Sequence, residues 1–152
     1  MLKKVNQKGF TIIEVLIVLA IAGVIMLVVF LAVPALQRNS RNTQRTNDAS
    51  LISAAVNECL SNNNGVLTAC NTTTGSGKLG QYLDTTKLRQ LTTVYGVGAT
   101  GTASTDAALV TFGTKCDTTG STSTTTGAGG KSFTIVYQVE TTSSTAGRCV
   151  ES

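Results

Sequence analysis

The chain has 152 residues, which is room for one ordinary domain or for a small domain together with a membrane helix. It contains no His, and without an imidazole the Ser-His and Cys-His nucleophile pairs of many hydrolases are excluded. The net charge is +4, but Lys3, Lys4 and Lys8 stand at the very start, where basic residues set membrane orientation. We therefore expect no specific nucleic-acid partner.

A long apolar segment follows this basic start. Residues 15–36 carry no charge and can cross roughly 30 Å of hydrocarbon at about 1.5 Å per residue. The stretch 1–9 ends in Gly9, whereas a secretory signal has its small-residue cleavage site after the apolar core. Cleavage after Gly9 would leave the apolar helix on the mature chain. Glu14 is the one charge that borders this segment, and an ionisable residue there is a candidate functional site.

The helical pattern continues beyond the apolar segment. From Gln37 to about Leu60 it is amphipathic, and the Asn-rich turn up to Gly65 ends it, because Asn and Gly both adopt the left-handed conformation of a helix C-terminus. Pro34 removes one helical hydrogen bond, and it either kinks the helix or marks its exit from the membrane. We expect one helix from roughly Gly9 to Leu60, half in the membrane and half in a soluble head.

Two faces of the amphipathic half follow from residue spacing. An apolar stripe is expected to pack on a sheet, and it consists of Leu51, Ile52, Ala55, Val56 and Cys59. Three Arg residues share a face just after the membrane segment: Arg38, Arg41 and Arg45. This basic face either contacts anionic headgroups or an acidic neighbour, or is simply solvated.

The rest of the sequence is expected to supply three or four short strands. The clearest is 131–140, where apolar and polar residues alternate between Phe133 and Val139, as in a half-buried strand. The other candidates are 91–97, 107–112 and an edge strand at 148–150. Residues 114–130 are of low complexity and are expected to form an exposed loop. Antiparallel strands packed on the helix stripe would give an α+β fold.

Four Cys residues follow the membrane segment: Cys59, Cys70, Cys116 and Cys149. Their even number and their position favour disulfides over free thiols. Zinc is the alternative, but no pair has the short C-x-x-C spacing and there is no His. Four Cys allow three ways of pairing. In one of them, a Cys59–Cys70 bridge would tie the helix end to the following loop. Asp106 and Asp117 lie in expected loops, but two isolated Asp are usually solvated rather than calcium ligands, so we expect no metal and no cofactor.

The N-terminal residues resemble a known signature. Gly9-Phe10-Thr11, with Glu14 and the apolar helix after them, looks like the processing and assembly motif of type IV prepilins. The resemblance implies that a membrane aspartic peptidase cuts between Gly9 and Phe10 and that the new Phe10 amine is methylated. It also implies that Glu14 pairs with the N-terminal amine of a neighbouring subunit during assembly, which fits the high cost of an unpaired buried carboxylate.

The resemblance also implies a fold and a set of domains. The expected fold is α+β, with a long N-terminal helix packed against a small antiparallel sheet. A leader would occupy residues 1–9, a transmembrane and assembly helix 10–36, and a globular head 37–152. A C-terminal disulfide, Cys116–Cys149, would enclose a loop of this head, as in many type IV pilins.

The function implied is that of a filament subunit and not of an enzyme. Its partners would be identical subunits in a helical filament, a prepilin peptidase, a membrane assembly platform and a cytoplasmic assembly ATPase. The precursor would lie in the cytoplasmic membrane with one span, and the mature chain in an extracellular pilus.

Other functions remain open. A pseudopilin of a type II secretion system, or a competence pilin for DNA uptake, shares the N-terminal signature, although four Cys and a Thr-rich head favour a surface pilin. A monomeric signal-anchored binding protein predicts no cleavage after Gly9 and no filament. A membrane-tethered enzyme is disfavoured, because there is no His and no convergent pair of acids.

Overall fold

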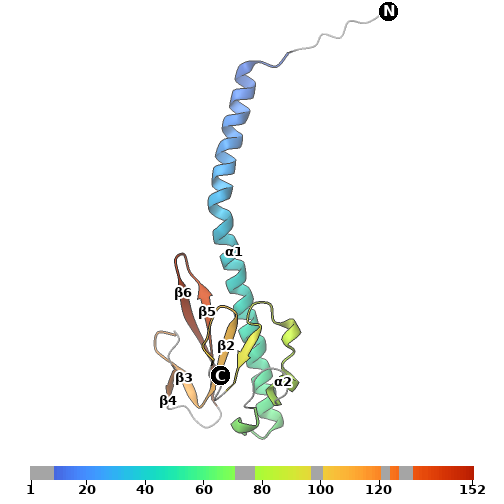
Figure 1. Cartoon of the computed structure of the whole chain (residues 1–152), viewed down its shortest axis with the longest axis vertical. Coiled ribbons are helices and arrows are strands. Elements are labelled where there is room, and N and C mark those ends of the chain that lie inside the picture. The colour runs from blue at the N-terminus through green and yellow to red at the C-terminus, as the bar shows by residue number, and fades with distance from the viewer. Residues whose placement is uncertain (1–8, 71–77, 97–100, 121–123, 127–131) are drawn as a thin grey trace, which may run out of the picture. The chain divides into compact units, whose positions relative to one another are not determined.

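The computed structural model describes residues 9–70, 78–96, 101–120, 124–126 and 132–152. The chain divides into two compact units, Met1–Gln37 and Arg38–Ser152. Apart from Gly9, the expected leader lies outside the described residues, as do parts of the expected low-complexity loop. Figure 1 shows the order of the elements along the chain.

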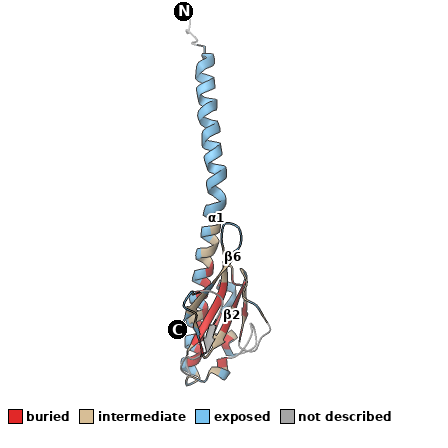
Figure 2. Ribbon diagram, turned by 90° about the vertical axis from the view of Figure 1, so that its left-hand side faces the viewer, coloured by how far each residue is buried: buried red, intermediate tan, exposed pale blue. Residues whose placement is uncertain are grey.

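Helix α1 (Ile12–Asn62) is the first element in Figure 1. It continues through Pro34, which lies inside the helix. The apolar residues in the part of α1 that belongs to the first unit are exposed, and the ribbon there is pale blue in Figure 2. Among the described helices, α1 is the one that is long and apolar enough to cross a membrane. The predicted long N-terminal helix is therefore confirmed.

The C-terminal end of α1 lies in the Asn-rich turn, as predicted. Asn64 has φ 55° and Gly65 has φ 74°, so both adopt the left-handed conformation. The Gly65 N–H donates to the Leu60 carbonyl at 2.7 Å, which satisfies a carbonyl that has no partner within the helix. A local signal in the sequence therefore sets the end of this long helix.

The main sheet contains four strands: β1 (Thr93–Tyr95), β2 (Ala107–Phe112), β5 (Phe133–Glu140) and β6 (Thr145–Glu151). Their order is β1-β2-β5-β6, with β2, β5 and β6 antiparallel. The long helix and the sheet confirm the α+β class. Strand β1 pairs with β2 in parallel, so the prediction of a wholly antiparallel sheet is wrong. Strand β6 is also longer than the predicted edge strand 148–150.

The parallel pairing results from the path of the chain between β1 and β2. Gly101 lies so close to the ring of Tyr95 that an added Cβ would come within 2.2 Å of Tyr95 Cγ. The chain thus folds back along β1, and the Asp106 carbonyl accepts a hydrogen bond from the Thr93 N–H at 3.2 Å. Strand β2 then begins beside the start of β1, with Ala107 opposite Thr93.

A second, two-stranded sheet consists of β3 (Thr114–Cys116) and β4 (Thr124–Thr126), which pair antiparallel. The prediction of a loop throughout 114–130 is therefore wrong at these strands. The hairpin also explains why β5 does not alternate between buried and exposed residues. Thr134 points away from the helix side and is nevertheless buried, because its Oγ1 lies 2.8 Å from Oγ1 of Thr114 on β3. The predicted half-buried strand is covered on both faces over most of its length.

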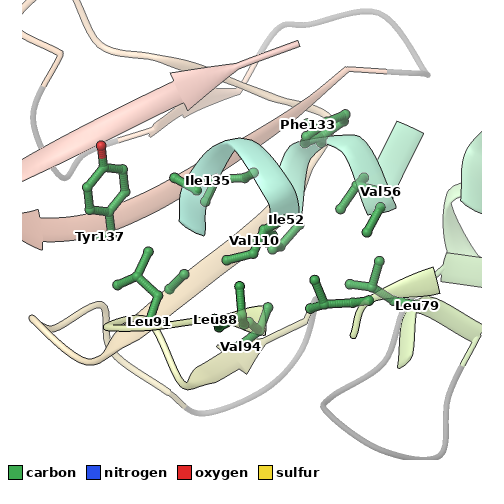
Figure 3. Packing of buried hydrophobic residues seen from close by; sticks show 14 of the residues in the cluster. Ile52, Val56, Leu79, Leu88, Leu91, Val94, Val110, Phe133, Ile135 and Tyr137 are labelled. Atoms are coloured by element: carbon green, nitrogen blue, oxygen red, sulfur yellow. The ribbon is translucent and has the colours of Figure 1, made fainter. Parts of the chain in front are cut away.

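One hydrophobic core joins the sheet to the second half of α1. Figure 3 shows Ile52 and Val56 of α1 packed over Val110 and Ile135 of the sheet. Four of the five predicted stripe residues are buried in this core, but Leu51 remains 43% exposed to solvent. The prediction for Leu51 is wrong because the buried face is centred on a row of side chains beside it, which consists of Arg45, Asp48, Ala49, Ile52, Ala55, Val56, Cys59 and Leu60.

Short helices and two disulfides complete the head. The helices are η1 (Leu67–Cys70), α2 (Lys78–Tyr82) and η2 (Thr85–Lys87). The disulfides join Cys59 to Cys70 and Cys116 to Cys149, which are the two pairings favoured from the sequence. The first ties the end of α1 to η1, and the second ties the β3–β4 hairpin to the edge strand β6.

Candidate functional site

The expected cleavage site lies just outside α1. Gly9 and Phe10 precede the first helical residue, Ile12, and neither is in regular secondary structure. The Phe10 side chain is 88% exposed, and no atom lies within 4 Å of the position that a Cβ on Gly9 would occupy. A peptidase needs an accessible, non-helical peptide bond, and the bond between these two residues meets that requirement.

Thr11 and Glu14 form a reciprocal capping interaction at the start of α1. The Thr11 N–H and the Thr11 hydroxyl both donate to Oε2 of Glu14, at 2.8 and 2.7 Å. In return, the Glu14 N–H donates to the Thr11 hydroxyl oxygen at 3.4 Å. This is a capping box, in which two otherwise unpaired donors of the helix start are satisfied. This role of Thr11 was not predicted, although the spacing Thr-Ile-Ile-Glu is the pattern that signals a capping box.

Glu14 stands alone among apolar neighbours. Ile13 is 64% exposed and Val15 is 49% exposed, so the carboxylate lies on a surface that must be covered by lipid or by other helices. Both hydrogen bonds from Thr11 end on Oε2, and Oε1 has no partner within the described chain. The site therefore holds the carboxylate in place at the helix start and leaves one oxygen for a further donor.

The basic face of α1 binds the end of strand β5, and this corrects both sequence-based interpretations for Arg41 and Arg45. Arg45 Nη2 donates to Glu140 Oε1 at 2.7 Å, and Arg41 Nε donates to the same oxygen at 3.0 Å. Arg41 Nη2 forms an ion pair with Glu140 Oε2. Arg45 is almost completely buried, at 4% exposure, and its Nε donates to the Thr105 carbonyl at 2.7 Å. These side chains therefore face their own head and not a lipid surface.

Two further contacts extend this arrangement, which we call the polar clamp (Arg38, Arg41, Asn42, Arg45 and Glu140). Asn42 bridges the backbone of Glu140: its Nδ2 donates to the Glu140 carbonyl at 2.8 Å and its Oδ1 accepts from the Glu140 N–H at 2.9 Å. Arg38 Nη1 donates to the Thr141 carbonyl at 3.2 Å. Hydrogen bonds from Arg41 and then Arg45 lower the pKa of Glu140 from 4.5 to about 2. Glu140 is thus ionised at any physiological pH, and it fixes α1 to the sheet.

Asp48 is a second polar anchor, and no sequence pattern pointed to it. Its side chain is 1% exposed, within the stripe of α1 that packs on the sheet. Its carboxylate accepts from the backbone N–H groups of three consecutive residues, with distances of 3.0 Å from Arg89, 2.6 Å from Gln90 and 2.9 Å from Leu91. A buried carboxylate is tolerated when its oxygens are bonded in this way. Asp48 therefore sets the path of the chain as it enters β1.

The two Asp residues considered as calcium ligands are bonded to nearby hydroxyls. Asp106 accepts from the Ser104 hydroxyl, and Asp117 accepts from the Thr119 hydroxyl at 2.7 Å. Among the described residues, no group of three or more His, Cys, Asp or Glu side chains is placed to hold a metal ion.

Comparison with known proteins adds one finding. Residues 4–30 match the family model described as the prokaryotic N-terminal methylation motif. This match covers the expected cleavage site, the capping box and most of the apolar segment. No curated protein and no solved structure matches the chain.

Proposed function

We propose that this chain is a structural subunit of a type IV pilus or a related filament. It carries the N-terminal methylation motif, which is the hallmark of type IV pilins and prepilin-like proteins. The motif implies processing by a prepilin peptidase and filament assembly in general. The observation that carries the proposal is the first part of α1, which exposes apolar side chains along its length and has a single carboxylate, Glu14, at its start. Such a surface is stable only in a membrane or when packed against other helices.

Processing after Gly9 would change the charge beside Glu14. The cut creates an amine on Phe10, which is followed at once by the capping residue Thr11. A positive amine is unfavourable at the positive end of a helix dipole, and a carboxylate offsets it. A neighbour's amine could bond to Glu14 Oε1 while Oε2 keeps its bonds to Thr11. Pairing of this kind would let a charged carboxylate enter an apolar filament core.

The location and the partners follow from this mechanism. Helix α1, the one described helix that is long and apolar enough to cross a membrane, fits a membrane-anchored precursor. Extraction from the membrane into an extracellular filament requires a prepilin peptidase, an assembly platform and an assembly ATPase, with identical subunits as the main contacts in the filament. The proposed role is structural and not catalytic.

A pseudopilin of a type II secretion system is the second candidate, because it carries the same N-terminal motif. Two disulfides and a Thr-rich head are features that suit a surface filament exposed to an oxidising medium. Filaments found on the cell surface under ordinary expression would support the pilus. Filaments that appear only on overproduction, together with a secretion defect in the deletion strain, would support the pseudopilin.

The assembly mechanism is tested by two substitutions with a matched control. Gly9→Val should leave the leader uncleaved, since the residue before the cut becomes branched and bulky. Glu14→Ala should be cleaved normally but should yield few or no filaments, whereas Ile13→Ala, which removes a neighbouring apolar side chain, should assemble. Cleavage is read from the mass of the chain and assembly from electron microscopy of sheared material. Normal filaments from Glu14→Ala would overturn the proposed pairing.

A further inference from the structure

An open groove runs between α1 and the edge of the main sheet. It has a volume of about 510 Å³ and lies between residues 39–46 of α1 and strands β5 and β6. Strand β6 is the last strand of the sheet, beyond β5. Tyr137, Val139 and Val150 give the groove apolar surface from the two strands. In Figure 3, Tyr137 and Phe133 lie apart along β5, with Ile135 between them.

The groove also contains an unpaired positive charge. Arg148 pairs through its backbone with Tyr137, so its side chain lies on the helix side of the sheet, and it lines the groove. This side chain is exposed and forms no hydrogen bond or ion pair within the described residues. Asn39 and Thr43 of α1 add polar groups opposite the strand. The groove therefore suits a partner that combines an apolar side chain with a carboxylate.

The same chain offers such a surface on the exposed face of α1, which we call the outer face (Leu51, Ala54 and Glu58). These residues lie three and seven positions apart, so they share one side of the helix. Leu51 is the large apolar residue of α1 that remains 43% exposed in the head. Glu58 is exposed and has no partner within the described residues. The other acidic residues of the described head are all bonded: Asp48, Asp84, Asp106, Asp117, Glu140 and Glu151.

We propose that the outer face of one copy docks into the groove of the next copy. Leu51 packs on Val150, and Glu58 pairs with Arg148, which lies two residues away on the same strand. The inference rests on the proposed filament and names a head-to-head contact within it. The two surfaces are different, so the contact is heterologous, and repetition of a heterologous contact builds an open helical array.

A second copy is required because one subunit cannot make this contact with itself. Glu58 lies twelve positions beyond Thr46, the last α1 residue that lines the groove, which corresponds to about 18 Å along the helix at ~1.5 Å per residue. A Glu side chain cannot span that length. The unpaired carboxylate and the unpaired guanidinium are therefore complementary only between copies.

Charge reversal tests the pairing in the full chain expressed in its filament-forming cells. Arg148→Glu and Glu58→Arg should each lower the yield of sheared filaments by about tenfold, because each places like charges in contact. The double variant should recover most of the wild-type yield. Lys115→Glu, which reverses an exposed charge on β3 outside the groove, should leave the yield unchanged. Recovery in the double variant would support the contact, and equal loss in both single variants and the double variant would overturn it.

A cross-link gives a readout that does not depend on charge. A photo-reactive residue at Leu51 should form dimers whose linked peptide comes from 137–150 of the second copy, and a matched probe at Lys115 should not. Absence of that peptide in abundant wild-type-like filaments would overturn this inference while leaving the filament itself in place. Absence of filaments from the wild type would instead count against the proposed function.

Discussion

Removal of the carboxylate at the centre of the polar clamp should weaken the attachment of α1 to the sheet in a pH-dependent manner. The substitution is Glu140→Gln, which keeps the size of the side chain and removes its charge. The pKa of Glu140 is lowered from 4.5 to about 2 by Arg41 and Arg45. At about 1.4 kcal/mol per pKa unit, this corresponds to an upper limit of about 3.5 kcal/mol. Because Arg41 is 40% exposed and Glu140 is 23% exposed, solvent screening reduces the expected loss to about 2 kcal/mol at pH 7.

The sign of the pH dependence follows from the direction of the shift. A carboxylate with a lowered pKa in the folded state contributes its full stability above pH 4.5, the ordinary value. That contribution is lost as the pH falls from about 5 towards 2. The wild type should therefore be about 2 kcal/mol more stable than Glu140→Gln at pH 7, and the difference should nearly vanish near pH 2.

The assay is denaturation of the detergent-solubilised mature chain, followed by near-ultraviolet circular dichroism of tyrosine. The chain has no Trp, and its three tyrosines, Tyr82, Tyr95 and Tyr137, all lie in the head, so the signal reports the head and not the apolar helix. Glu58→Gln is the matched control, since Glu58 is exposed and unpaired in the described monomer and should show no loss. A gap between wild type and Glu140→Gln that stays constant from pH 7 to pH 2.5 would refute the ion-pair explanation.

Three further substitutions test the head in the same assay. Asp48→Ala leaves the N–H groups of residues 89–91 without their acceptor, and it should lower the free energy of unfolding by about 3–5 kcal/mol. Hydrogen exchange at those three amides should become faster. Unchanged exchange there would contradict the role of Asp48 as their acceptor. Gly101→Val must displace the ring of Tyr95 and should destabilise the head by roughly 1–3 kcal/mol, with an altered Tyr95 signal, while an undisturbed spectrum would argue against the close approach. Cys149→Ser opens the second disulfide and should cost roughly 3–4 kcal/mol in a chain-entropy account. Reduction of the wild type also opens Cys59–Cys70 and should therefore cost more than this substitution.

The features that could be predicted from the sequence depend on residues close together in the chain. The apolar segment, the helix end at Asn64 and Gly65, and the position of Glu14 at the start of the helix are local patterns. The capping role of Thr11 was equally local and could have been read from its spacing to Glu14.

The features that the sequence analysis missed depend on distant partners. Arg41 meets Glu140 across a separation of 99 residues, and Asp48 meets Arg89 across 41. No periodicity distinguishes a solvated Arg from one that binds a strand end. The parallel pairing of β1 and the burial of Thr134 likewise depend on where the chain returns after a loop, which residue types alone do not determine.

Processing after Gly9 and assembly through the N-terminal helix together define the proposed role of the chain. The most direct test is N-terminal sequencing and intact mass of the chain in material sheared from cells. We expect filaments whose subunit begins with a methylated Phe10 and whose mass is lower by the four hydrogens lost in forming two disulfides. A chain that still begins at Met1 and stays in the membrane fraction would contradict the account and favour a simple signal anchor.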